Sequence, residues 1–203
     1  MVHLRIIEQY AKENNIPIME KEGIEFLTNF IKENNIKTIL EIGSAIGYSA
    51  IKMALIDENI KIVTIERDID RYNLAIKNIN DFNLDNQIKI INDDAFNVNI
   101  RNKFDLIFID AAKAQYIKFF EKFKTNLKSD GYIITDNLNF HGLTHTKEHI
   151  ESRNVRQLVR KINNYIDFLK TNEEFDTTFL EIGDGVGVSK RVSLSNSVDE
   201  TKN

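Results

Sequence analysis

The hydrophobic pattern of the chain switches repeatedly between short apolar runs and helical periods. Runs of consecutive apolar residues, bounded by polar turn residues, predict buried strands at 38–42, 61–66, 87–91, 104–109 and 131–135. Apolar residues at helical spacing predict helices at 4–14, 20–33, 48–56, 68–80, 114–125 and 150–170. Two further strands, 175–182 and 186–192, flank Gly183-Asp184-Gly185 and predict a β-hairpin. This order indicates a doubly wound α/β fold whose mostly parallel sheet carries an antiparallel C-terminal hairpin.

Two of the predicted helices have distinct faces. The helix at 114–125 is expected to bury Ile117, Phe120 and Phe123. In the helix at 150–170, a rotation of about 100° per residue gathers the apolar side chains on one face: Val155, Leu158, Val159, Ile162, Ile166 and Leu169. The opposite face carries Arg153, Arg156 and Arg160. This is either a solvated face or a stripe that contacts phosphates, joined by Lys147 and Lys161.

Composition limits the class of protein. The chain has 203 residues, which suits a single domain (1–203) with N-terminal helices in 1–35 and a frayed polar tail at 193–203. It has no Cys, so disulfides and thiolate chemistry are excluded. No apolar run approaches the roughly 20 residues of a membrane span, and we expect a cytoplasmic protein that does not bind membranes. A net charge of −4 does not indicate nucleic-acid binding, although a local basic face would suffice for it.

A glycine turn follows the first predicted strand. Gly43 and Gly47 separate the strand from the next helix, which is the arrangement of a cradle for a nucleotide-like ligand at the edge of a parallel sheet. Ala45 stands where the dinucleotide fingerprint has its second glycine, which disfavours a nicotinamide cofactor. Glu41 precedes the turn, where its carboxylate could accept a hydrogen bond from a ligand ammonium group. A turn that binds nothing remains the alternative.

Acidic residues end the following strands. Glu66 comes 23 positions after Gly43, close to the offset at which a carboxylate binds a ribose hydroxyl. Asp110 ends one strand, and Asp136 and Asn137 end the strand that we expect beside it. Their oxygens are hard ligands that suit Mg²⁺, although residues 136–137 would equally suit the start of a turn.

Other polar residues near these strand ends are candidates for substrate contact. Lys113, three residues after Asp110, is either a solvated lysine or a group that reaches over the same crevice. The loop at 138–149 holds His141, His145 and His149, which we interpret as substrate contacts or surface residues in preference to metal ligands. Tyr116 and Phe140 would either stack on a planar substrate or lie in the core.

Five motifs carry a resemblance to a known family. In order they are ILEIGSAIGYSAI, VTIERD, NDDAF, FDLIFIDAAKAQY and GYIITDN, and together they span most of the chain from Pro17 to Arg191. The chain resembles the cation-dependent O-methyltransferases that use S-adenosyl-L-methionine, which include catechol and caffeoyl-CoA enzymes. The resemblance implies a seven-stranded, Rossmann-like sheet, a hydroxyl acceptor, and Mg²⁺ or another divalent cation.

The resemblance also implies roles for individual residues. Cofactor binding would fall to Met19, Glu41, Gly43, Ser49, Glu66, Asp94, Ala95 and Asp110, with Glu66 at the ribose and Asp94 and Ala95 at the adenine. The metal ligands would be Asp110, Asp136 and Asn137. Lys113 would act as the general base, beside Asp110 in the catalytic centre.

The C-terminal half resembles a narrower group. DNLNFHG, SRNVRQLVRKIN and FLEIGDGVGVSKR are most similar to the bacterial tRNA 5-hydroxyuridine methyltransferases, which make 5-methoxyuridine at the wobble position. This implies a tRNA partner contacted by residues such as Arg153, Arg156, Tyr116 and His141. It also implies a homodimer, for which the N-terminal helices are plausible elements. A catechol-type enzyme that acts on small molecules is the alternative.

Overall fold

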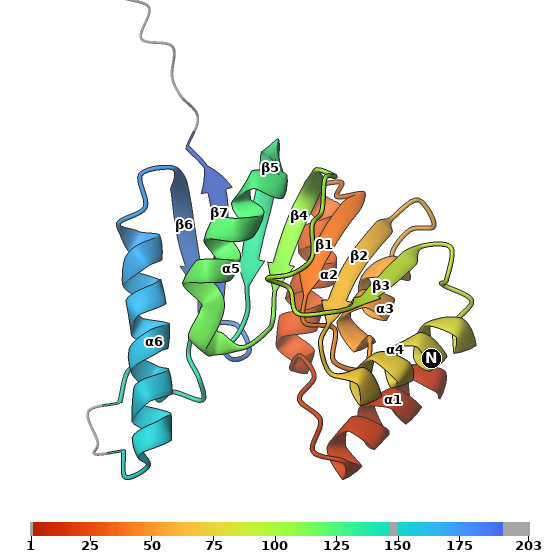
Figure 1. Ribbon diagram of the computed structural model, residues 1–203, viewed down its shortest axis with the longest axis horizontal. Coiled ribbons are helices and arrows are strands. Elements are labelled where there is room, and N and C mark those ends of the chain that lie inside the picture. The colour runs from red at the N-terminus through yellow and green to blue at the C-terminus, as the bar shows by residue number, and fades with distance from the viewer. Residues whose placement is uncertain (1, 147–149, 193–203) are drawn as a thin grey trace, which may run out of the picture.

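The computed structural model describes residues 2–146 and 150–192, so Lys147, His149 and the expected tail at 193–203 lie outside the described part. In the described residues seven strands form one sheet (Figure 1). They are β1 (Thr38–Ile42), β2 (Lys61–Glu66), β3 (Ile88–Asn92), β4 (Phe104–Ile109), β5 (Leu127–Thr135), β6 (Phe175–Leu180) and β7 (Val186–Arg191). Their order across the sheet is β3-β2-β1-β4-β5-β7-β6.

The direction of the strands places the candidate residues that follow β1, β2, β4 and β5 at one edge of the sheet. Neighbours among β1 to β5 pair in parallel, whereas β7 pairs antiparallel with both β5 and β6. This confirms the predicted parallel sheet with an antiparallel C-terminal hairpin. The C-terminal ends of β1, β2, β4 and β5 point the same way, toward the lower edge in Figure 1.

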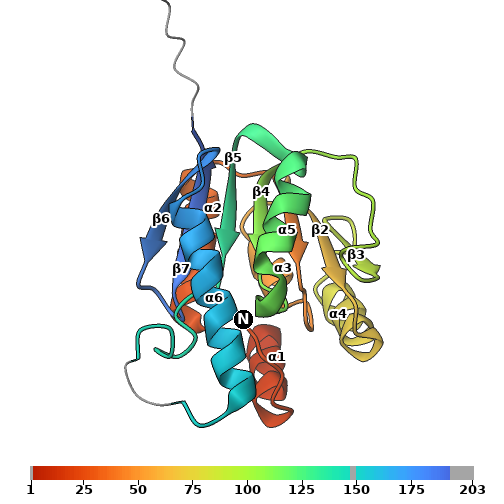
Figure 2. The ribbon, with the colours of Figure 1, turned by 60° about the vertical axis from the view of Figure 1, so that its left-hand side comes forward.

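Helices cover both faces of the sheet. They are α1 (Val2–Glu13), α2 (Lys21–Glu33), α3 (Tyr48–Ala54), α4 (Ile69–Asp81), α5 (Tyr116–Phe123) and α6 (Arg153–Lys170), with 3-10 turns at Lys113–Gln115 and Lys124–Asn126. Figures 1 and 2 show α5 and α6 on the near face, α2 and α3 behind the sheet, and α1 beside α4 at the lower edge. No helix in the described residues is both long and apolar enough to cross a bilayer.

Alternation along the strands builds two cores. On β1, Ile39 packs with the core beneath α1 to α3, and Leu40 packs with the core beneath α5 and α6. Both side chains are fully buried, and each contributes about 1.5–3 kcal/mol relative to an exposed position. The apolar runs of the sequence are therefore strands that are covered on both faces.

Two predicted details were wrong. Phe120 and Phe123 are buried as predicted, but Ile117 is 37% exposed, because Tyr116 and Phe119 complete the buried stripe of α5 in its place. Strand β5 begins at Leu127 and not at Gly131, and its register against β4 shifts between Phe104 and Leu106. The residues at 128–130 are polar and exposed, so the hydrophobic pattern did not predict this part of the strand.

The start of β1 is fixed by a carboxylate on the neighbouring strand. Asp105 Oδ2 accepts hydrogen bonds from the backbone N–H groups of Lys37 (3.1 Å) and Thr38 (2.8 Å) and from the Thr38 hydroxyl (2.8 Å). Its other oxygen accepts one from Lys128 Nζ at 2.8 Å. Burial acts to raise the pKa of Asp105, but the bonds from Lys128 and Thr38 outweigh it and lower the pKa below 3.8.

Asp105→Asn is therefore expected to reduce the free energy of unfolding by about 1–2 kcal/mol at pH 7, allowing for partial solvent exposure. Because the folded pKa is lowered, this stabilisation is present above about pH 4 and is lost as the pH falls through the folded value. Urea unfolding at pH 7 and pH 3.5 measures it, with Asp130→Asn, an exposed position, as the control. A loss that does not shrink at the lower pH would contradict the assignment.

Candidate active site

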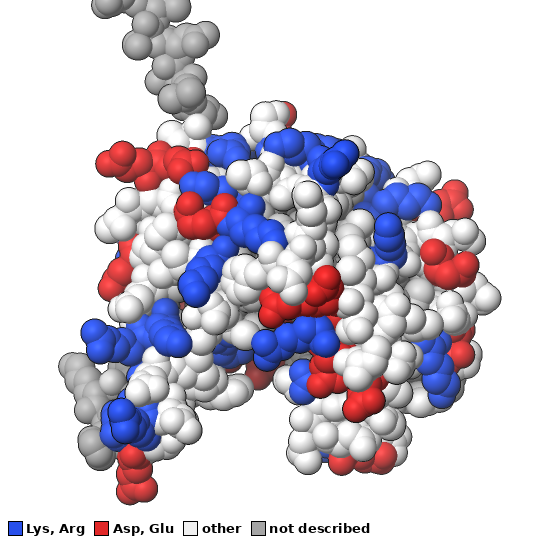
Figure 3. All heavy atoms as spheres, in the orientation of Figure 1, with Lys and Arg blue, Asp and Glu red and all other residues white. Residues whose placement is uncertain are grey.

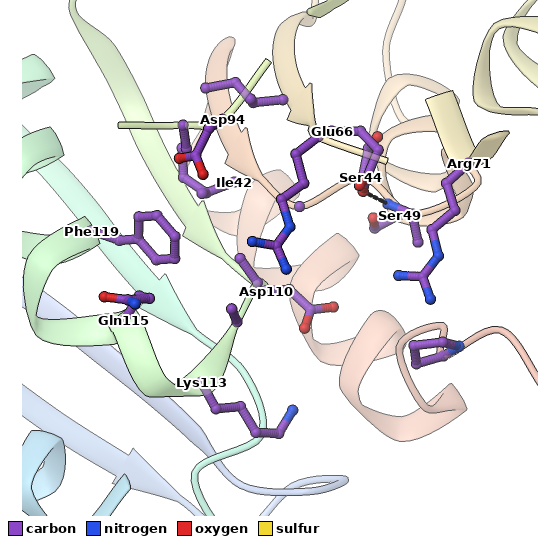
Figure 4. A pocket seen from close by; sticks show the side chains of 18 of the residues that line it. Ile42, Ser44, Ser49, Glu66, Arg71, Asp94, Asp110, Lys113, Gln115 and Phe119 are labelled. Atoms are coloured by element: carbon purple, nitrogen blue, oxygen red, sulfur yellow. Dashed lines mark hydrogen bonds between the residues drawn. The ribbon is translucent and has the colours of Figure 1, made fainter. Parts of the chain in front are cut away.

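A cavity of about 400 Å³ opens at the C-terminal edge of the parallel strands (Figure 4). Its wall is formed by the β1–α3 turn, the ends of β2, β3 and β4, and the connector at 17–19 that joins α1 to α2. The predicted residues that line it are Met19, Gly43, Ser49, Glu66, Asp94, Ala95, Asp110, Lys113 and Asn137. The expected cofactor residues therefore come together, with the exception of Glu41.

The glycine turn brings two strand ends into contact. Gly43 has φ +94°, and a Cβ at this position would lie 2.2 Å from the carbonyl oxygen of Asp110, so only glycine fits. Ala45 has φ +45°, and its N–H donates to Glu66 Oε2 at 2.9 Å. The N–H of Asp68 donates to Glu66 Oε1, also at 2.9 Å. The Glu66 carboxylate is thus held from both sides at the cavity wall.

Glu41 lies behind the cavity and not in its lining. Alternation along β1 directs its side chain toward α3, where it is fully buried. It accepts hydrogen bonds from the hydroxyls of Ser49 and Thr64, each at 2.5 Å. Burial, only partly offset by these two bonds, raises the pKa of Glu41 to about 7. Glu41 therefore does not contact the cavity directly. It orients the hydroxyl of Ser49, and Ser49 does line the cavity.

Two carboxylates meet where β4 and β5 end side by side. Asp136 is buried, and this burial, together with the charge of Asp110, raises its pKa to about 7. Asn137 Nδ2 donates to Asp136 Oδ2 at 2.7 Å, and Lys113 Nζ donates to Asn137 Oδ1. The negative charge of the pair is incompletely balanced, and two carboxylates with one amide oxygen are the donor set that a hard divalent cation takes.

The histidines give no support to a metal site of their own. Among the described residues, no group of three or more His, Cys, Asp or Glu side chains is placed to hold a metal ion. His141 is exposed and does not line the cavity. A divalent cation at the β4 and β5 ends would therefore need the amide of Asn137 as its third protein ligand.

Asp184 is a buried acidic residue that the sequence did not reveal. It sits in the β6–β7 hairpin and accepts a hydrogen bond from the backbone N–H of His141. The carbonyls of Asp184 and Gly185 accept from Asn139 N (2.7 Å) and Leu138 N (2.9 Å). The hairpin thereby fixes the loop that follows Asn137. The contact joins residues 43 positions apart, so no local spacing could have predicted it.

Tyr116 belongs to the core and does not face a ligand. It is 1% exposed, and its hydroxyl donates to the carbonyl oxygen of Asp136 at 3.0 Å. Its ring packs edge-on against Tyr165, with the centroids 5.3 Å apart. The other aromatic candidate, Phe140, has its ring centroid 5.9 Å from Lys113 Nζ. Tyr116 therefore fixes the backbone at Asp136 through this hydrogen bond.

Several lining residues were not predicted. Phe119 faces the cavity near Gln115 and Asp94 (Figure 4), and its ring stacks on Phe96 with 4.8 Å between centroids. This is an apolar wall suited to a planar base. Ser44 also lines the cavity, and its buried hydroxyl has no hydrogen-bond partner within the described part of the chain. A polar atom left without a partner beside a cavity fits a site that is completed by a ligand.

The arginine face of α6 is only partly free. Arg153 and Arg160 are exposed, as predicted. Arg156 Nη1 donates to the carbonyl of Glu151 at 2.8 Å and to that of Ile150, so this guanidinium holds the entry to the helix. Figure 3 shows a hollow at the lower edge of the molecule, between the N-terminal end of α6 and α1, with Lys and Arg side chains gathered on the α6 side. The basic side chains thus border the region onto which the strand ends point.

Comparisons with known proteins show the family to which the chain belongs. A family described as O-methyltransferase matches residues 2–192. A Staphylococcus aureus structure described as a "putative caffeoyl-CoA O-methyltransferase" is 39% identical, with a TM-score of 0.88, and the match covers 93% of this chain and 92% of that one. A caffeoyl-CoA O-methyltransferase of Populus kitakamiensis is 27% identical over 194 residues, covering 91% of this chain and 82% of the relative. The SAH-bound Podospora anserina methyltransferase PaMTH1, at 22% identity, shares the fold with a TM-score of 0.85 over 94% of this chain and 88% of that one.

The raised pKa of Glu41 leads to a prediction about stability. A carboxyl that ionises at about 7 when folded, and at 4.5 when unfolded, favours folding below pH 4.5 and loses that contribution as the pH rises through 7. The loss amounts to about 3 kcal/mol. Glu41→Gln should abolish it, so the wild type should lose about 3 kcal/mol more than the variant between pH 5 and pH 8.

Urea unfolding at the two pH values measures this difference. Asp110 and Asp136 titrate in both proteins, so the comparison removes their contributions except for the part of the Asp110 titration that depends on the charge of Glu41. Parallel pH profiles for the wild type and Glu41→Gln would refute the assignment.

Proposed function

Because the chain belongs to the O-methyltransferase family, we propose that it transfers the methyl group of S-adenosyl-L-methionine to a hydroxyl oxygen with the help of a divalent cation. The observation that carries this proposal is the desolvated pair Asp110 and Asp136, placed at adjacent strand ends beside a cavity of nucleoside size. Lys113 and Asn137 stand at the same point. The site thus joins a cofactor cradle to a charged centre for an acceptor.

The cavity has a place for each part of the cofactor. The Glu66 carboxylate, held by the N–H groups of Ala45 and Asp68, retains lone pairs for the hydroxyls of a ribose. Phe119 and Asp94 supply an apolar wall and an acceptor for the adenine. Ser49, oriented by Glu41, and the backbone at Gly43 would hold the methionine part. These assignments follow the ligand crevice of doubly wound sheets.

The acceptor site derives its chemistry from charge. When bound, a divalent cation such as Mg²⁺ would supply the Lewis acidity that lowers the pKa of the substrate hydroxyl. Asp110, Asp136 and Asn137 would hold it. Lys113 Nζ, held by Asn137 and beside Phe140, is the group placed to receive the hydroxyl proton, a role that it can fill only as the neutral amine. The C–S bond of the sulfonium breaks as the O–C bond forms, and the fixed geometry replaces a random encounter.

For the acceptor we propose 5-hydroxyuridine at the tRNA wobble position, which would give 5-methoxyuridine. The support is the C-terminal resemblance together with the exposed Arg153 and Arg160 of α6, the helix that borders the hollow of Figure 3. A small-molecule catechol is the second candidate. The names of the relatives favour it, because they include caffeoyl-CoA enzymes.

The cation is tested by Asp136→Asn, with Asp85→Asn as the control at an exposed position. The first variant should lose Mn²⁺ binding, measured by electron paramagnetic resonance, and about 100-fold or more in methyl transfer. Its affinity for S-adenosylhomocysteine should stay within about twofold of the wild type, because Asp136 does not line the cavity. Retention of both Mn²⁺ binding and activity would overturn the metal mechanism.

The substrate is tested by mass spectrometry of tRNA nucleosides from cells with and without the gene. Loss of 5-methoxyuridine and accumulation of 5-hydroxyuridine are expected in the deletion strain, and restoration is expected with the wild-type gene but not with Asp136→Asn. Unchanged nucleosides, combined with turnover of a catechol by the purified protein, would favour the small-molecule alternative.

A further inference from the structure

One lysine of α5 holds the loop after β3, residues 93–98, which forms part of the cavity wall. Lys122 Nζ donates to three backbone carbonyls of this loop, those of Ala95 (2.7 Å), Phe96 (2.7 Å) and Val98 (2.9 Å). An ammonium group has three N–H donors and no acceptor, so these contacts use its whole hydrogen-bonding capacity. A single side chain therefore ties this irregular loop to α5.

The same helix supports the loop through an aromatic contact. Phe119 stacks on Phe96, with 4.8 Å between the ring centroids and 12° between the ring planes. Phe119 lines the cavity near Asp94 (Figure 4). Residues three apart are neighbours on a helix surface, so Phe119 and Lys122 act on the loop from one face of α5.

The loop presents an unpaired backbone donor at the cavity. Ala95 lines the cavity and is 8% exposed, and no group in the described part of the chain accepts a hydrogen bond from its N–H. A buried N–H of this kind fits a position that a ligand completes. Because Lys122 holds the carbonyl of the same residue, the ammonium helps to set the direction of this N–H.

We propose that Lys122 is a positioning residue for the base of the cofactor, because its ammonium holds the 93–98 loop in the shape that binds the adenine. Lys122 does not line the cavity, so it acts through the backbone that it holds. The identity of the ligand rests on the proposed function. The hold on the loop does not, and it can be tested without a cofactor.

The binding test removes the ammonium and then restores it. The chain has no cysteine, so Lys122→Cys introduces a single thiol. Bromoethylamine converts this thiol to a side chain with an ammonium at the position of the lysine Nζ, and 1-bromopropane converts it to a neutral side chain of the same length. Calorimetry should show that S-adenosylhomocysteine binds the propyl protein about tenfold or more weakly than the wild type, and the aminoethyl protein within about threefold.

The matched control is Lys118→Cys, alkylated in the same two ways. Lys118 is an exposed residue of α5 outside the cavity lining, so both of its alkylated forms should bind like the wild type. Equal affinities of the propyl and aminoethyl proteins at position 122 would overturn the proposal, because the positive charge would then have no part in cofactor binding.

Base selectivity separates positioning from a merely structural role. S-inosylhomocysteine carries an oxygen in place of the adenine amino group, so the ratio of its affinity to that of S-adenosylhomocysteine reports on contacts with the base. The wild type should prefer the adenine compound, the propyl protein should lose most of this preference, and the aminoethyl protein should keep it. An unchanged ratio in the propyl protein would refute positioning, whatever its melting temperature.

Hydrogen exchange in the cofactor-free protein tests the hold on the loop by itself. The N–H groups of Asn97 and Val98 donate to the carbonyl of Asp94 at 2.8 Å and 3.3 Å. They should exchange faster in Lys122→Met than in the wild type, whereas the amides of β4 should not change and Lys118→Met should match the wild type. Equal exchange in the loop would refute the inference.

The two levels of inference fail in different ways. If the wild type binds S-adenosylhomocysteine and loss of the ammonium changes neither affinity nor selectivity, the role of Lys122 is refuted and the proposed function stands. If the wild type does not bind this compound, the proposed function fails and the role in base binding fails with it. Faster exchange in Lys122→Met would then show only that the lysine holds the loop.

Discussion

The backbone contact between Gly43 and Asp110 sets the geometry of the whole site. With no Cβ in the way, the turn after β1 packs directly against the end of β4, where a side-chain atom would meet the Asp110 carbonyl at 2.2 Å. The turn holds Glu66 through Ala45 N, and Asp110 faces Asp136 across to β5. A cofactor cradle and a charged centre are thus separated by no more than one strand, which is the closeness that group transfer between two ligands requires.

Buried acidic groups are arranged around this contact in two layers. Glu41 is fully buried, and its carboxylate accepts hydrogen bonds from the hydroxyls of Ser49 and Thr64 and from no cationic side chain among the described residues. Asp136 is sealed behind Asn137, with Tyr116 bonded to its carbonyl. Groups kept in such surroundings favour their neutral forms until a positive charge arrives. A sulfonium donor and a divalent cation are both positive, so the same protein charge would serve two ligands.

Much of the fold could be read from the chain, because its information is local. Strands covered on both faces give unbroken apolar runs, so β1, β2 and β4 were located to the residue. The acidic strand ends then followed from the topology. What could not be predicted were contacts set by tertiary packing: the exposure of Ile117, the polar beginning of β5, and the placement of Glu41 behind Ser49. Asp184 and Phe119 carry no spacing signal, since each acquires its role only when distant segments meet.

The hold of Asp184 on the loop after Asn137 has a consequence for synthesis. The hairpin that carries Asp184 ends at Arg191, whereas the residues proposed to contact the cofactor all lie at or before Phe119. A chain that is still being translated therefore contains the residues proposed to contact the cofactor well before it contains Asp184, which holds the loop after Asn137. The loop that follows Asn137 therefore takes its final position only after β7 has been translated and has paired with β5.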